Sequence, residues 1–214
     1  MKPIFMQRLR VIIALFTLFS STNFVSAAVV LPVPFTVQAP FGNWSSPWQD
    51  FCEEASVVMV AHYLWKLPLT PKFADAEMQL IKTYETYVFG RYKDTSAEET
   101  TQILRNLYGF KEARVLYDPR LADIKRELSG GNPLIVPVAG RLLGNPYFRP
   151  PGPLYHMLVI KGFDDAREVF ITNDPGTRRG ENLEYPQKKL FEAIHDWNGG
   201  DVTRGKRAMI VIGK

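Results

Sequence analysis

The only cysteine in this chain of 214 residues, Cys52, is a candidate nucleophile. A single cysteine cannot form an internal disulfide. In an oxidising compartment an unpaired thiol is a partner for another molecule, a buried small side chain or a nucleophile. A thiol attacks a carbonyl only as the thiolate, so its usual pKa of about 8.5 must fall or a base must take its proton. The rest of the chain must therefore supply an activating group.

Three histidines are candidates for that base, and their positions separate them. His62 lies ten residues after Cys52 on the same expected helix, about 15 Å along its axis and too far to reach the sulfur. His195 lies in a C-terminal helical pattern, where a surface or packing role is expected. His156 opens an expected strand directly after a long loop rich in proline and glycine, residues 141–153, and such loops often carry functional residues. We therefore predict His156 as the general base.

A third group must hold the imidazole in the right tautomer, and a carboxylate or amide on a neighbouring strand can do so. Residues 164–167 predict a hairpin turn, which places His156 roughly opposite residues 172–174. Asn173 and Asp174 are then both within reach, but side chains alternate along a strand and only one of the two should face the histidine. We predict Asp174, with Asn173 as the alternative.

The nucleophile is expected at the start of a helix. Residues 52–65 place packing side chains at helical spacing, and Glu53 and Glu54 lie in the first turn. A helix N-terminus favours an anion at Cys52, and its unpaired N–H groups can form part of an oxyanion hole. The two carboxylates oppose a thiolate unless their side chains face elsewhere.

The remaining pattern predicts helices first and strands later. Further helices are expected from Thr70-Pro71, from the Ser96/Glu99 capping box to Gly109, from Asp118-Pro119 to Gly130-Gly131, and over residues 186–197. Strands are expected at residues 134–138, 156–163, 169–172 and 208–212, with residues 29–35 as an extended lead-in or edge strand. This order predicts an α+β fold in which the helix of Cys52 packs on a mostly antiparallel sheet.

Residues 1–27 have the three-part pattern of a secretory signal peptide. Three basic residues precede an apolar run, residues 11–19, and a small-residue stretch ends at Ala27. The apolar run is shorter than the roughly 20 residues that span a bilayer, so no retained membrane anchor is expected. We expect cleavage after Ala27, or one residue later, and a secreted or cell-envelope protein in which residues 28–214 form one domain.

Charge and composition argue against several classes of partner. Removal of residues 1–27 leaves 23 Lys+Arg against 22 Asp+Glu, a net charge of +1, so no nucleic acid is expected as a ligand. One cysteine and three dispersed histidines provide no cluster of metal ligands, and we expect neither metal nor cofactor. We expect a monomer that acts on peptides or proteins.

Four motifs, taken in order, resemble a known family. They are Gln38-Ala39-Pro40-Phe41-Gly42-Asn43-Trp44, Cys52-Glu53-Glu54-Ala55-Ser56, His156, and Asn173-Asp174-Pro175-Gly176. The pattern resembles the papain-like cysteine peptidases related to the double-glycine leader peptidases, which process bacteriocin precursors. The resemblance extends from about residue 33 to the final strand. It implies a papain-like fold with Cys52 as nucleophile, His156 as base, Asp174 as orienting residue and Gln38 as side-chain donor to the oxyanion.

Two differences from that family bear on function. Gln38 lies 14 residues before Cys52, a longer spacing than is usual in papain-like enzymes, so a loop must fold it back; Gln49 is the alternative donor. The leader peptidases have Cys-Gly where this chain has Cys52-Glu53, and they are fused to export transporters, so double-glycine specificity is not expected. An exported cysteine peptidase is the leading hypothesis. The alternatives are an amidase or acyl transferase acting on cell-wall or protein amides, and a catalytically inactive binding module.

Overall fold

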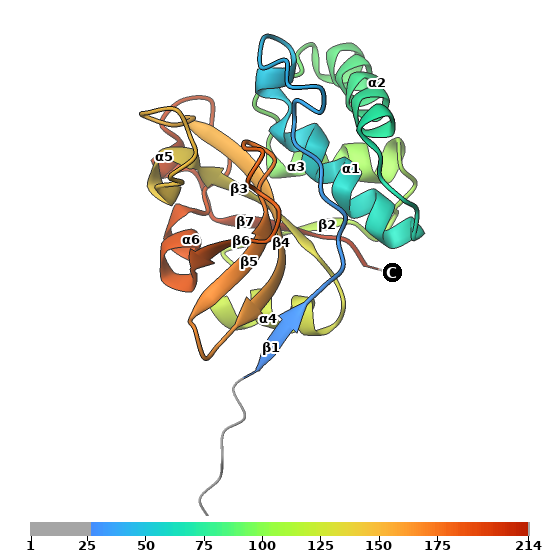
Figure 1. Ribbon diagram of the computed structural model, residues 1–214. Coiled ribbons are helices and arrows are strands. Elements are labelled where there is room, and N and C mark those ends of the chain that lie inside the picture. Colours follow the sequence, from blue (N-terminus) through green and yellow to red (C-terminus); the bar gives the residue numbers. More distant parts are fainter. Residues whose placement is uncertain (1–26, 214) are drawn as a thin grey trace, which may run out of the picture.

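The computed structural model describes residues 27–213, so the predicted signal peptide lies outside the described residues apart from Ala27. A seven-stranded sheet whose pairings are all antiparallel forms the centre of the molecule (Figure 1). Helices cover it, which confirms the predicted α+β fold. Between residues 27 and 213 no helix is both long and apolar enough to cross a membrane.

The strands of the sheet come almost entirely from the second half of the chain. In spatial order they are β2 (Arg114–Tyr117), β7 (Ala208–Val211), β3 (Leu134–Ala139), β4 (Tyr155–Asp164), β5 (Val169–Asn173) and β6 (Leu183–Pro186). A short strand near the N-terminus, β1 (Ala28–Val30), pairs with β4 as well. The strand that begins beside His156 is therefore the longest and one of the most central.

Among residues 27–213, five of the six α-helices gather in two groups, and α4 (Leu121–Ser129) lies apart from them near β1. The other five are α1 (Cys52–Trp65), α2 (Pro71–Phe89), α3 (Ala97–Asn106), α5 (Gly140–Leu143) and α6 (Gln187–Ala193), with 3₁₀ turns at Trp48–Asp50 and Val202–Arg204. Figure 1 shows α1, α2 and α3 together on one side of the sheet and α5 and α6 on the other. Helix α1 packs directly on β4 and β3. The expected helix of Cys52 is thus present with the bounds predicted for it.

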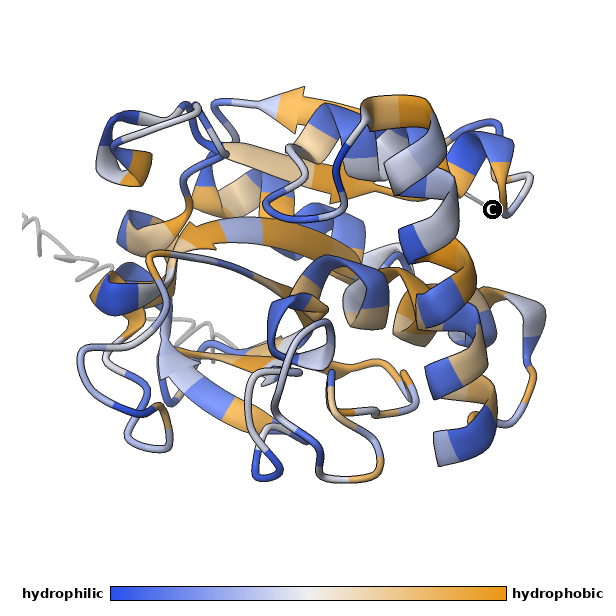
Figure 2. Cartoon of the chain, turned by 90° about the horizontal axis from the view of Figure 1, so that it is seen from above, coloured by the Kyte–Doolittle hydropathy of each residue, from blue (hydrophilic) through white to orange (hydrophobic). Residues whose placement is uncertain are grey.

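Helix α1 is enclosed by the rest of the molecule rather than amphipathic. Every residue from Cys52 to His62 is buried, including Glu53 and Glu54. In Figure 2 the central strands are mostly hydrophobic, whereas the loops are largely hydrophilic. Burial of the helix on all sides removes its polar side chains from water, so the acidic residues of the first turn are surrounded by other protein groups.

Local sequence signals define the neighbouring helices. Thr70 caps α2 by accepting a hydrogen bond from the Phe73 N–H at 3.3 Å, with Pro71 at the first helical position. The predicted capping box of Ser96 and Glu99 begins α3. These signals are local, which is why the sequence predicts them well.

An N-terminal strap, residues 28–38, is hydrogen-bonded to the central strand β4 and to the end of β5. After β1 pairs with β4, the Leu31 N–H donates to the Lys161 carbonyl at 2.8 Å, and the buried Lys161 Nζ donates to the Val33 carbonyl at 3.1 Å. The Gln38 N–H donates to the Pro175 carbonyl at 3.0 Å. The strap thereby joins β4 to the turn that follows β5.

Candidate active site

Cys52 occupies the first position of α1, and no side chain caps this helix end. The backbone N–H groups of the first turn have no carbonyl partner within the helix. The Cys52 side chain is 8% exposed and lies on a cleft of about 860 Å³ that is also lined by Gln38 and His156. The chain thus brings the predicted nucleophile, base and oxyanion donor to one cleft.

His156 forms a short contact with Asp174. The His156 Nε2 lies 2.7 Å from Asp174 Oδ1, and both side chains are almost fully buried. The ring edge of His156 also packs against the ring of Phe148, with 5.2 Å between centroids. Because Nε2 is committed to the carboxylate, Nδ1 is the ring nitrogen available to accept another proton.

Asp174 has every acceptor position occupied. Oδ1 also accepts from the Gly176 N–H at 3.0 Å, while Oδ2 accepts from the Tyr185 hydroxyl at 2.7 Å and from Asn145 Nδ2 at 3.0 Å. Burial by itself would raise the pKa of Asp174, but His156 and these hydrogen bonds outweigh it and lower the pKa. The carboxylate is therefore ionised and held in one orientation at neutral pH.

The hairpin register differs from the one expected from the sequence. Val159 pairs with Asn173, and an irregularity between Ile160 and Gly162 shifts the strands, so β5 has already ended at the level of His156. Asp174 reaches the histidine from the turn after β5. Asn173 faces the other way and donates to the backbone carbonyls of the N-terminal strap at 3.1 Å. Of the two candidates Asp174 and Asn173, Asp174 is the one that contacts His156, and it does so from a turn rather than from a strand.

The Cys52 sulfur lies beside the start of β4. The backbone N–H of Met157, the residue after His156, acts to lower the pKa of the Cys52 thiol. Burial acts more strongly in the other direction and raises the pKa of the Cys52 thiol, and the charge of Glu53 raises it further. The resting sulfur is therefore a neutral thiol on the histidine side of the cleft.

Glu53 is in direct contact with the Cys52 thiol and adds to the effect of burial. The Cys52 thiol donates to Glu53 Oε2, with 3.0 Å between the atoms. Burial raises the pKa of Glu53 to about 7, although the hydrogen bond from the thiol and the charge of His156 act to lower it. The carboxylate that the sequence analysis left free to face elsewhere is thus in contact with the nucleophile.

Glu54 lies close enough to Glu85 on α2 for their charges to repel each other. Both are fully buried, and in the described part of the chain neither carboxyl has a hydrogen-bond donor. Burial and mutual repulsion raise the pKa of Glu54 well above its usual value, and burial followed by the charge of Glu53 raises the pKa of Glu85 to about 9. At least one of the pair is a neutral carboxylic acid near pH 7.

Gln38 reaches the cleft but uses its amide elsewhere. Its Nε2 donates to the backbone carbonyls of Trp48 at 3.1 Å and Gln49 at 2.6 Å, in the turn just before Cys52. One of these bonds must open before the amide can reach an oxyanion. Gln49, the alternative donor, lies on the same cleft with its side chain exposed.

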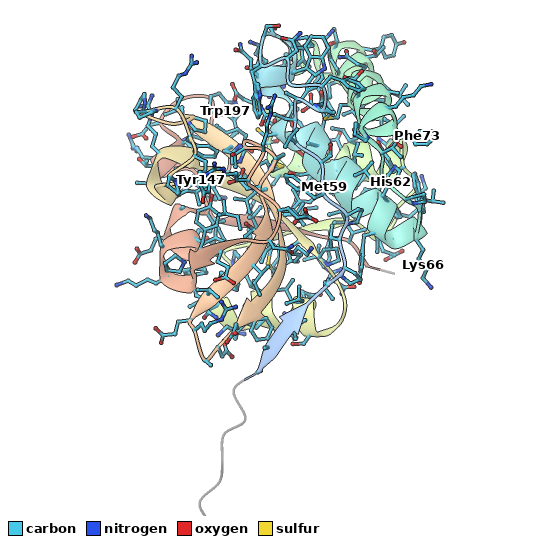
Figure 3. All side chains as sticks on the ribbon, in the orientation of Figure 1. Met59, His62, Lys66, Phe73, Tyr147 and Trp197 are labelled. Carbon is cyan, nitrogen blue, oxygen red and sulfur yellow. The ribbon has the colours of Figure 1, made fainter. Side chains whose placement is uncertain are left out.

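The walls of the cleft carry aromatic and charged side chains. Trp44, Tyr147, Phe148, Tyr155 and Trp197 are the aromatic residues, Arg149, Arg178 and Arg179 the basic ones, and Asp50, Glu53 and Asp94 the acidic ones. Figure 3 labels Tyr147 and Trp197, which lie on the sheet side of α1, whereas Lys66 lies at the far end of that helix. The cleft thus offers both apolar surface and charge to a ligand.

The other two histidines are away from this cleft. His62 pairs with Glu77 at 2.7 Å and lines a separate, mostly apolar cavity of about 880 Å³ at the far end of α1. His195 Nδ1 contacts the Gly205 carbonyl at 2.8 Å. Among residues 27–213, no group of three or more histidine, cysteine or acidic side chains is arranged to hold a metal ion.

Tyr185 and Asn145, which hold Asp174, are functional residues that the sequence pattern does not predict. Tyr185 lies on β6, a strand of four residues with weak alternation that was not predicted. Asn145 follows α5, a single helical turn at the start of the segment predicted to be irregular. The only sequence signal was the loop of residues 141–153, which indicated a functional region without specifying which side chain matters.

Comparisons with known proteins bear on the family and the fold of the chain. The model of the Peptidase_C39 like family matches residues 30–200. A solved structure from Bacillus anthracis, described as that of a C39-like peptidase, matches with a TM-score of 0.58 and 17% sequence identity, covering 88% of this chain and 98% of that one. No curated protein matches. At this identity the solved structure shows a shared fold.

Proposed function

The chain belongs to the Peptidase_C39 like family, and from this premise we propose that it is a cysteine peptidase that hydrolyses peptide bonds through Cys52, His156 and Asp174. The observation that carries the proposal is the 2.7 Å contact of His156 Nε2 with Asp174, on the same cleft as Cys52. This contact fixes the tautomer in which Nδ1 accepts a proton from the thiol.

The proposed reaction has two halves. The Cys52 thiol passes its proton to His156 Nδ1, and the sulfur attacks the peptide carbonyl carbon. The tetrahedral oxyanion accepts hydrogen bonds from the Cys52 N–H and from the amide of Gln38, or of Gln49. His156 then protonates the leaving amine, and a thioester forms. Water, deprotonated by His156, attacks the thioester and releases the acid and the free thiol.

The charged wall next to His156 favours particular substrates. Arg178 and Arg179 follow the turn of Asp174, and the Arg179 guanidinium lies 5.1 Å from the centre of the Tyr147 ring. Within residues 27–213, neither of these two arginines forms an ion pair, whereas other arginines do. Because both arginines line the cleft of His156, which the leaving amine must approach, the proposed role of their guanidinium groups is to bind an acidic side chain or a free carboxylate beyond the cleaved bond.

We also propose that residues 1–27 direct export and that the remainder acts outside the cytoplasm as a monomer. Only the sequence pattern of the first 27 residues supports export. N-terminal sequencing of the protein recovered from its host tests it, and an intact Met1 would contradict cleavage.

The central experiment offers substrates side by side. Purified protein is incubated with casein-derived peptides and with cell-wall peptide fragments, and products are identified by mass. Hydrolysis of backbone peptide bonds that is lost in Cys52→Ala and His156→Ala supports the proposal. Release of ammonia, or transfer of an acyl group to an added amine, would assign an amidase or acyl transferase instead.

One observation favours a second candidate, a binding module without activity. The thiol is neutral and donates to Glu53, which opposes a thiolate. Under this alternative Cys52→Ala binds peptides as well as the original protein does, and neither protein cleaves them.

A further inference from the structure

Glu53 is the acidic side chain in direct contact with the nucleophile. It is 1% exposed, its Oε2 accepts from the Cys52 thiol at 3.0 Å, and its Oε1 has no partner among the described residues. A buried carboxyl with one free oxygen can either accept the thiol proton's hydrogen bond or, when protonated, donate its own. The same contact can therefore oppose or favour the thiolate.

The groups around Glu53 come from every element packed against it. They are Cys52 and Glu54 on α1, Glu85 on α2, Asp94 in the loop before α3, and Tyr155 and His156 on β4. Asp94 and Glu85 repel a Glu53 carboxylate, whereas the charge of His156 and the thiol hydrogen bond stabilise it. Burial among them raises the pKa of Glu53 to about 7, so both of its forms are populated near neutral pH.

We propose that Glu53 is a positioning residue that decides whether Cys52 can ionise. As a carboxylate it accepts the thiol hydrogen bond and keeps the sulfur neutral; as a carboxylic acid it donates a hydrogen bond to the thiolate. The inference rests on the proposed role of Cys52 as nucleophile.

The protons held by Glu53, Cys52 and His156 can be followed through both forms of Glu53. When Glu53 is a carboxylic acid, the thiol proton moves to His156 Nδ1, and the thiolate is flanked by the imidazolium, the Met157 N–H and the Glu53 hydroxyl. When Glu53 loses its proton to solvent, the thiolate recovers one from His156 and donates to the carboxylate. Ionisation of Glu53 thus turns the nucleophile off as pH rises.

The test measures alkylation of Cys52 by iodoacetamide between pH 5 and pH 9. We expect the rate of the original protein to fall as pH rises through about 7, opposite to a simple thiol, whose reactive fraction rises with pH and reaches one half at its pKa of about 8.5. Glu53→Gln keeps the shape and always offers an amide donor, so it should lose this fall. At pH 8 it should react about tenfold faster than the original protein, the effect of about one pKa unit.

Glu54→Gln is the matched control, because Glu54 is adjacent on the helix but faces Glu85. It should retain the falling profile. Equal rates for Glu53→Gln and the original protein at pH 8, or a Glu54→Gln variant that behaves like Glu53→Gln, would overturn the inference. If Glu53→Gln does not fold, the profile of the original protein decides alone, since a rate that climbs from pH 6 to pH 8 contradicts it.

Peptide cleavage is followed in parallel, so the two proposals fail separately. Cleavage with no effect of Glu53→Gln on alkylation refutes only the role of Glu53. An alkylation profile that depends on Glu53 without any cleavage refutes only the peptidase.

Discussion

His156 Nε2 and Asp174 Oδ1 lie 2.7 Å apart although β5 ends before it reaches the level of the histidine. The contact depends on the turn after the strand, which is held by hydrogen bonds from Tyr185 and Asn145 to the other carboxylate oxygen. The orientation of the imidazole is therefore set by residues from β6 and from the loop before β4.

Removal of the Asp174 carboxyl should lower activity much more than its neutralisation. Asp174→Ala leaves the ring of His156 without an acceptor, and we expect kcat/KM to fall about a hundredfold or more. Asp174→Asn keeps an oxygen for Nε2 and should lose less. Peptide hydrolysis by the two variants checks the order. Similar losses for both Asp174 variants would show that charge, rather than orientation, is what matters.

The two candidate oxyanion donors can be separated by mutation. Gln38→Ala should lower kcat about a hundredfold, the usual cost of one such donor, while Gln49→Ala should change it less than about threefold. Gln38 also holds the turn before Cys52, so thermal unfolding of each variant is measured alongside. The opposite ranking at equal stability would assign the role to Gln49.

Arg178 and Arg179 should make the enzyme prefer acidic groups after the cleaved bond. For matched peptides with Glu or Gln at the first two positions beyond that bond, the Glu peptide should have the higher kcat/KM. In the double variant Arg178→Gln/Arg179→Gln, the ratio of kcat/KM for the Glu peptide to that for the Gln peptide should fall about tenfold. A charged hydrogen bond contributes about 1.5–3 kcal/mol when well formed. Lys72→Gln, on the exposed surface of α2, is the control. An unchanged ratio in the double variant would place substrate binding elsewhere.

The buried Glu85 should make folding stability depend on pH. Burial, then the charge of Glu53, raises its pKa from 4.5 to about 9, so the folded state holds its proton more tightly than the unfolded state. Its contribution to stability is complete below about pH 4.5 and is lost as pH rises toward about 9.

Glu85→Gln should remove much of that loss. The melting temperature of the original protein should fall by about 5 °C or more between pH 5 and pH 8.5, and by clearly less in the variant, as expected for changes of one or two kcal/mol. Glu112→Gln, an exposed carboxyl, should track the original protein. A Glu85→Gln variant with the same pH dependence would contradict a protonated Glu85.

The sequence predicts those parts of the fold that depend on local signals. Helix α1 has the predicted bounds, and the strands at residues 134, 156, 169 and 208 begin at or within one residue of their predicted positions. Strands β2 and β6 are four residues long and lie at the two ends of the sheet. They are defined by hydrogen bonding to a neighbouring strand rather than by a hydrophobic pattern in their own sequence. A local reading of the sequence therefore cannot find them.

The candidate site likewise combines features that the sequence predicts with features that depend on tertiary structure. Cys52, His156 and Asp174 follow from residue type and order, but the register that joins the last two includes a strand irregularity that no composition reveals. The contact of Glu53 with the thiol depends on how far α1 is buried under its neighbours, which is a tertiary property.

The N-terminal strap can be shortened by proteolysis. Residues 28–38 begin at the predicted cleavage point and finish at Gln38, hydrogen-bonded to the backbone beside Asp174. An aminopeptidase that trims the chain past Val30 removes β1, and further trimming releases the residue proposed to bind the oxyanion. Stepwise proteolysis from this end would then limit the time for which the protein is active, while Cys52 itself stays intact.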